Sequence, residues 1–142
     1  MTDAELVARK LSFLREHLAR MRDRRTDDVD SLRRDAVLRD ALALSVLVVV
    51  QEAIDIAFHI CSDEGWGIPA TYREAFELLA QHNVIDAGLA ASLAGATHLR
   101  NRIAHGYASM DVDRLWADVP TGVAAFEAFA AAVARHAAKA PT

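Results

Sequence analysis

Four residues whose side chains could do chemistry stand together at the end of a predicted helix. They form the pattern Arg100-Asn101-x-x-x-His105-x-Tyr107. Histidine titrates near neutral pH and can transfer a proton in either direction, whereas arginine stays charged and can bind two phosphate oxygens at once. Residue frequencies in this chain give roughly 0.0001 chance occurrences of the full pattern. The motif is therefore the leading candidate for a functional site.

This pattern resembles the signature of the HEPN-domain toxins of HEPN/MNT toxin-antitoxin pairs, the HepT-like proteins. The resemblance extends to residues 51–60, 72–80 and 93–116, which is most of the chain after Asp35. It implies a HEPN-like fold and a type VII toxin, a metal-independent endoribonuclease without a cofactor, whose cleft lies at a homodimer interface. It also implies a cognate MNT-type nucleotidyltransferase as the antitoxin. By this resemblance, Arg100, Asn101 and His105 would form the nuclease site, and the antitoxin would adenylylate Tyr107.

The chemistry of these residues is consistent with RNA cleavage. Attack of a 2′-hydroxyl on the adjacent phosphorus needs one group to remove a proton, one to supply a proton, and positive charge against the phosphorane. His105 could act as general acid or base, Arg100 as the clamp on phosphate and transition state, and Asn101 as an orienting residue. AMP groups on Tyr107 would place phosphates beside these cations and so occupy the groups that RNA needs.

The spacing of the motif restricts how it could work. On an ideal helix Arg100 and His105 are about 140° apart, so they cannot both face one phosphate from the middle of a helix. Either the helix unwinds before Gly106, or residues of two chains meet across a two-fold axis. Asn101 lies about 40° from His105 and could steady its imidazole or a phosphate. Gly106 should let the chain leave the helix and turn Tyr107 outward.

Arg100 lies along the apolar stripe of its predicted helix, so its charge needs an acidic neighbour. Asp55 and Glu52 are the candidates, and Asp55 also resembles the acidic position of the family. Asp55 and His59 stand at i and i+4 and could hold a metal ion. Two ligands without a nearby third favour a polar pair in the core, so we expect no metal.

Long helices account for the rest of the chain, which shows no strand-like alternation. Apolar spacing, together with a capping box from Thr71 to Glu74 and a helix start at Asp86, defines them. The expected helices cover residues 3–24, 36–61, 71–83, 86–106 and 119–138, with a short turn or helical linker at 26–35. Short connections favour antiparallel neighbours. We therefore predict an all-α, up-and-down antiparallel bundle that forms one domain over residues 1–142.

The predicted helix at residues 36–61 is apolar nearly all round. Leu42 and Val49 lie on one side, whereas Leu44 and Val48 lie on the opposite side among polar residues. A small bundle can cover one side of such a helix, so a symmetric homodimer is the default hypothesis for the other. The alternative is that a flanking helix of the same chain covers both sides.

Composition and charge exclude several classes of protein. With 53% hydrophobic and 25% charged residues in 142, the chain is neither disordered nor collagen-like. A net charge of -4 means that RNA binding must be local, and we expect no DNA partner. One cysteine, Cys61, excludes internal disulfides and fits a reducing cytoplasm. The charged N-terminus is unlike a signal peptide, and the apolar stretch at residues 41–50 is too short to span a membrane, so we expect a cytoplasmic protein without membrane contact.

A competing interpretation is a noncatalytic helical binding module that partners a nucleotidyltransferase. Such a module would not need intact Arg100, Asn101 and His105. A purely structural role is the alternative for Arg100 and Tyr107: Arg100 would form a salt bridge at the helix end, and the ring of Tyr107 would be half-buried. His98 shares the face of His105, and we expect it to be solvent-exposed. The basic residues at 22–25 alternate with an acid and predict a solvated surface.

Overall fold

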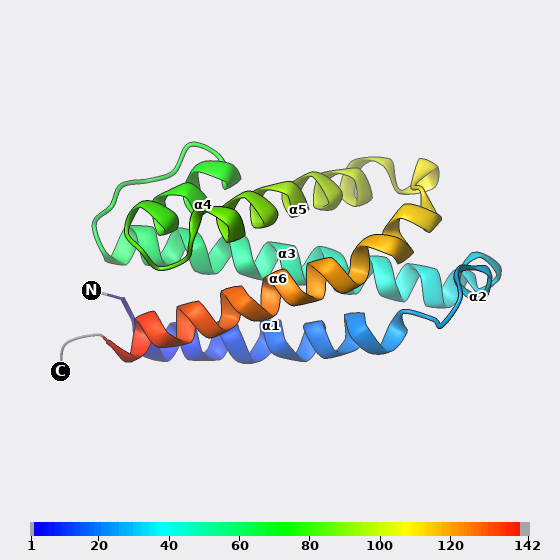
Figure 1. Ribbon diagram of the computed structural model, residues 1–142, viewed down its shortest axis with the longest axis horizontal. Helices are drawn as coiled ribbons and strands as arrows, with labels where there is room; N and C mark the ends of the chain where they lie inside the picture. The colour runs from blue at the N-terminus through cyan, green and yellow to red at the C-terminus, as the bar shows by residue number, and fades with distance from the viewer. Residues whose placement is uncertain (1, 140–142) are drawn as a thin grey trace.

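The computed structural model describes residues 2–139, and within this range every regular element is a helix (Figure 1). The elements are α1 (Ala4–Arg24), α2 (Val29–Arg34), α3 (Ala36–Asp63), α4 (Tyr72–Gln81), α5 (Ala87–Gly106), the 3₁₀ turn η1 (Tyr107–Ser109) and α6 (Val112–Ala138). Consecutive long helices run in opposite directions along the bundle. The predicted all-α antiparallel architecture is confirmed, with α2 as the helical linker.

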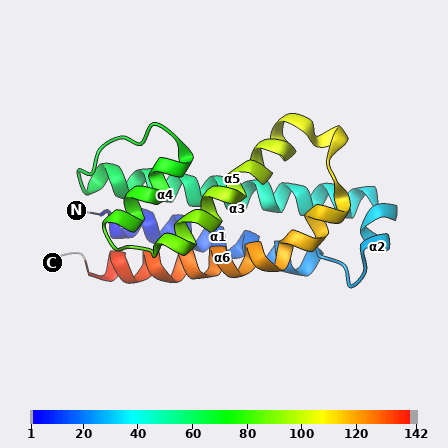
Figure 2. The ribbon, with the colours of Figure 1, turned by 45° about the horizontal axis from the view of Figure 1, so that its top comes forward.

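Helix α3 is the centre of the bundle. It packs against all five other α-helices, whereas α1 packs against both α3 and α6, and α4 lies against α3 and α5 (Figures 1 and 2). A continuous core of buried apolar side chains draws on all six α-helices. Most of α3 is covered within this chain, which explains why the helix is apolar on several sides. Leu44 remains 56% exposed, so part of its outer face has no cover from the same chain.

Each of the six α-helices begins at a side chain that accepts a hydrogen bond from a backbone N–H of the first turn. These N-caps are Asp3, Asp28, Asp35, Thr71, Asp86 and Asp111. Such caps satisfy donors that a helix start otherwise leaves without partners. The predicted caps at Thr71 and Asp86 are confirmed. The Glu74 carboxylate reaches back to the N–H of Ala70, one residue before the position typical of a capping box.

The last helix begins earlier than the sequence predicts. It starts at Val112, capped by Asp111, and not near residue 119, so Pro120 lies inside it. Proline has no N–H to donate to the carbonyl four residues earlier, which here belongs to Trp116. That carbonyl accepts a hydrogen bond from Nε of Arg25 at 2.8 Å. The helix continues through Pro120 because a side chain from the end of α1 replaces the missing donor.

Arg25 also contacts the ring of Trp116. Its guanidinium carbon lies 3.8 Å from the centroid of that ring, in a cation–π arrangement. The indole N–H of Trp116 donates to the Thr26 carbonyl at 2.8 Å. Arg24 donates to the Ser45 hydroxyl at 2.6 Å. The prediction of a solvated surface at residues 22–25 is thus wrong for two of the three arginines, which join α1 to α6 and α3.

By length and composition alone, α3 and α6 could each cross a membrane. Of the most apolar 18-residue segment of each helix, 56% is buried inside the bundle in α3 and 39% in α6. Packing in the core therefore accounts for much of their apolar character.

The bond between Arg25 and the Trp116 carbonyl gives a test of this end of the bundle. Arg25→Ala should lower the free energy of unfolding by about 1–2 kcal/mol, because it leaves a part-buried carbonyl without a donor. In a Pro120→Ala background the loss should be smaller, since the new backbone N–H at position 120 can donate to Trp116. Urea unfolding of the four chains of this double-mutant cycle measures the coupling. Arg15→Ala, exposed on α1, is the control, and equal losses in both backgrounds would contradict the replacement of a donor.

Candidate active site

The motif lies in the last two turns of α5 and in the turn that follows. Helix α5 remains helical from Ala87 to Gly106, so it does not unwind before the glycine. Arg100 and His105 are therefore separated by five residues of continuous helix, about 140° around its axis. Of the two alternatives that the sequence left open, unwinding of the helix is excluded. A single chain does not direct these two side chains at the same point.

One face of α5 carries four exposed polar side chains. They are His98, Asn101, Arg102 and His105, which have the spacing i, i+3, i+4 and i+7 of a single helix face. The predicted exposure of His98 is confirmed. Asn101 and His105 stand one turn apart, so an amide and an imidazole can contact the same ligand. This face can exchange protons and donate hydrogen bonds to phosphate oxygens.

Arg100 lies at the edge of this face and is half-buried. Its Nη1 donates to Oδ1 of Asn101 at 3.2 Å. Its Nε is buried and has no hydrogen-bond partner among the described residues. A buried donor without a partner is costly, so this guanidinium is able to gain a further acceptor when another group approaches. Asn101 restrains its orientation.

Tyr107 is the first residue of η1 and is 39% exposed. Its hydroxyl donates a hydrogen bond to Oδ1 of Asp40, near the start of α3. The expected exposure of Tyr107 is confirmed, but the turn differs from the expected glycine cap. Gly106 has a φ of -143°, and the chain leaves α5 through the 3₁₀ turn and not through a left-handed residue.

The sequence does not identify Asp40 as a partner of Tyr107. No local pattern relates it to Tyr107, which lies 67 residues later. The only available signal is that Asp40 is the last charged residue before the apolar stretch at residues 41–50. The antiparallel packing of α5 on α3 brings the two residues together (Figure 1).

The expected ion pair between Arg100 and Asp55 or Glu52 is not found. The Glu52 carboxylate lies 3.8 Å from the Lys10 ammonium, and Asp55 accepts a hydrogen bond from the Gln51 amide at 3.1 Å. The register of the two helices gives the reason. Tyr107, directly after the end of α5, meets Asp40 of α3. Arg100 is therefore level with about residue 47 of α3, and Glu52 is about 7 Å further along the axis.

Asp55 and His59, the pair considered as metal ligands, lie in the C-terminal half of α3. Within residues 2–139, no three His, Cys, Asp or Glu side chains gather closely enough to hold a metal ion. Asp55 and His59 instead line a surface cavity between α3 and the loop before α4, together with Phe58 and Ile68.

The sequence and the fold both have counterparts among known proteins. A family model described as "Ribonuclease HepT-like" matches residues 14–133. The chain is 29% identical over 109 residues to the mRNA nuclease HepT of Shewanella oneidensis, covering 77% of this chain and 81% of the relative. It is 30% identical over 115 residues to the tRNA nuclease HepT of Aphanizomenon flos-aquae, covering 81% of this chain and 74% of the relative.

A solved structure agrees with these sequence matches. The tri-AMPylated HEPN toxin of Shewanella oneidensis, in complex with its MNT antitoxin, superposes with a TM-score of 0.83 at 28% identity. The match covers 94% of this chain and 98% of that toxin. The likeness therefore extends over the whole bundle and includes the end that carries the motif.

Proposed function

Because this chain belongs to the ribonuclease HepT-like family, we propose that it is the endoribonuclease toxin of a HEPN/MNT pair and cleaves RNA with Arg100, Asn101 and His105. One observation carries the assignment of the site. The motif residues Asn101 and His105 are exposed on one face of α5, next to a guanidinium that retains a free donor. A noncatalytic module that only partners the nucleotidyltransferase would need no such set.

The residues divide the reaction between them. His105 exchanges protons with the attacking 2′-hydroxyl or with the leaving 5′-oxygen. Arg100 binds the non-bridging oxygens of the scissile phosphate and opposes the charge that grows on them in the phosphorane. Asn101 holds the guanidinium of Arg100 in place through the hydrogen bond between Oδ1 and Nη1. We infer a cytoplasmic site of action, because RNA and its nucleotidyltransferase partner would be met there.

A homodimer would complete the site. Arg100 and His105 of one chain point apart on a continuous helix, and Leu44 leaves an exposed apolar patch on the neighbouring helix α3. A two-fold axis near this patch would cover Leu44 and bring Arg100 of one chain toward His105 of the other.

Tyr107 is the proposed acceptor of AMP from the antitoxin. Its Oη attacks the α-phosphorus of a nucleoside triphosphate, the bond to the bridging oxygen breaks, and pyrophosphate leaves with the electron pair. The proton of the hydroxyl passes to the Asp40 carboxylate that already accepts its hydrogen bond. The attached phosphodiester then stands near Arg100 and His105, where it competes with RNA for the same cations.

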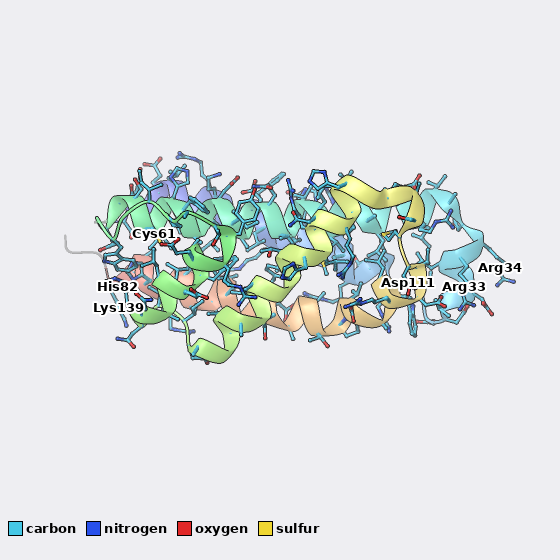
Figure 3. The ribbon with its side chains drawn as sticks, turned by 90° about the horizontal axis from the view of Figure 1, so that it is seen from above. Arg33, Arg34, Cys61, His82, Asp111 and Lys139 are labelled. Atoms are coloured by element: carbon cyan, nitrogen blue, oxygen red, sulfur yellow. The ribbon has the colours of Figure 1, made fainter. Side chains whose placement is uncertain are left out.

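Substitution of His105 tests the ribonuclease assignment. His105→Ala should lower the rate of RNA cleavage by about 10²–10⁴-fold, the usual contribution of a general acid or base. Growth arrest on expression in bacteria should disappear with it. His82→Ala is the matched control, because His82 stacks on Trp66 at the opposite end of the bundle from the motif (Figure 3). Full cleavage and growth arrest by His105→Ala would favour the noncatalytic module.

Mixed dimers test the shared site. Chains with Arg100→Ala and chains with His105→Ala are each expected to be inactive, whereas their mixture should recover about a quarter of the wild-type activity. Half of randomly assorted dimers contain both variants, and each of these has one of its two sites intact. Cleavage is measured after the variants have been unfolded and refolded together. No recovery, with mixed dimers verified by mass spectrometry, would show that each chain builds its own site.

Tyr107 and Asp40 test the regulation. Tyr107→Phe should cleave RNA but escape silencing by the co-expressed antitoxin, and mass spectrometry should find AMP on Tyr107 of the wild-type chain only.

Asp40→Asn keeps an oxygen acceptor but cannot take the proton, so modification should slow by about 10²-fold or more. Asp23→Asn, which removes an exposed charge from α1, is the control. Modification of Asp40→Asn at the wild-type rate would disprove the role of that carboxylate.

A further inference from the structure

Two residues on the exposed face of α5 have no role in the site described above. His98 and Arg102 alternate with Asn101 and His105 along that face, and all four are exposed. His98 and Arg102 also line a groove between α5 and α6. The two helices diverge toward the end of the bundle that carries the motif (Figures 2 and 3). This groove begins beside the motif.

The α5–α6 groove consists of two adjoining cavities. The larger, of about 410 Å³, has walls that include His98 and Arg102 from α5 and Arg114 from α6. The smaller, of about 120 Å³, shares Arg102 and Arg114 and extends to Gly106 and Ser109 beside η1. The two cavities therefore lie side by side along α5, from the turn after the motif toward the middle of the bundle. The larger cavity alone lies within the range of volumes that hold small ligands in proteins.

Small residues line part of the larger cavity. Gly95 and Ala96 of α5 face Gly122 and Ala125 of α6 along the larger cavity. A larger residue at any of these positions would fill part of the space between the helices. The groove is therefore shaped by backbone and methyl groups, while its longer polar side chains come from the residues near the motif.

One cation of the groove has no ionic partner. Arg102 is exposed and has no ion pair among the described residues. Arg114 lies 3.6 Å from Asp118, which also lines the larger cavity, in an exposed pair that contributes little and exchanges readily. Asp111 lines the smaller cavity, but its carboxylate caps the N-terminus of α6 through the N–H of Arg114. Two carboxylates thus offset the two arginines of the groove, and Arg102 is the one of these arginines that can meet a phosphate without first leaving an ion pair.

We propose that the α5–α6 groove binds the stretch of single-stranded RNA next to the scissile phosphate, with Arg102 and Arg114 contacting its backbone; this rests on the proposed ribonuclease function. Arg102 and His98 stand about 4.5 Å and 10 Å before His105 along the helix axis. At those distances from His105, the two side chains would contact the nucleotides that adjoin the cleaved linkage. Arginine binds backbone phosphate without regard to base, so the groove supplies affinity and not sequence preference.

Binding of RNA by chains that cannot cleave it tests this groove. In the His105→Ala background, a fluorescein-labelled single-stranded oligoribonucleotide of mixed sequence is titrated at several salt concentrations. Arg102→Gln and Arg114→Gln should each raise Kd several-fold and reduce the slope of log Kd against log salt by about one. Arg135→Gln removes an equal charge from an exposed site further along α6 and should leave both quantities unchanged. Arg102→Lys, which keeps the charge, should retain most of the affinity.

Steady-state cleavage in the otherwise wild-type chain separates this inference from the ribonuclease function. Arg102→Gln should raise KM and keep kcat, as expected when binding is lost equally in ground and transition states. If His105→Ala stops cleavage but the groove variants keep wild-type Kd, salt slope and KM, the groove inference is wrong and the function stands. A fall in kcat at unchanged KM, or weaker antitoxin binding with unchanged RNA affinity, would also overturn it. Absence of cleavage and of RNA binding in the wild-type chain would instead refute the proposed function.

Discussion

The packing of α5 along the apolar helix α3 is the constraint on which the site depends. It keeps α5 helical to Gly106, and it sets the level at which each motif residue meets α3. Tyr107 reaches Asp40 for this reason, and Arg100 stands too far from Glu52 and Asp55 to pair with them. A continuous helix also separates the imidazole from the guanidinium. On the proposal of a shared site, the same contact that stabilises the bundle leaves the site of one chain incomplete.

Features set by neighbouring residues could be predicted from the sequence. The caps at Thr71 and Asp86 and most helix bounds follow from local hydrogen bonding and apolar spacing, which require no knowledge of distant parts of the chain. The motif itself was visible because its residues are close in sequence. Its exposed face follows from the helical repeat alone, as the accessibility of His98 and His105 illustrates.

Features set by the register between helices could not be predicted. The start of α6 was placed too late because Pro120 is tolerated only through Arg25, which lies 91 residues before Trp116. Asp40 was overlooked and Arg100 was assigned the wrong partners because both questions depend on which residues of α3 stand level with α5. Apolar periodicity shows which face of a helix is buried but leaves its axial position against a neighbour undetermined.

The low number of available cations connects the nuclease with its regulation. In a chain of net charge -4, long-range attraction cannot concentrate RNA, so the few arginines near His105 must supply the local field. Each AMP attached at Tyr107 adds about one negative charge within that field. Three such groups would offset the charge of Arg100, Arg102 and Arg114 together. A strongly basic nuclease would keep most of its attraction for RNA after such a modification, whereas an acidic one with a small basic site would lose it, which is why the proposed modification of Tyr107 would need only a modest covalent change.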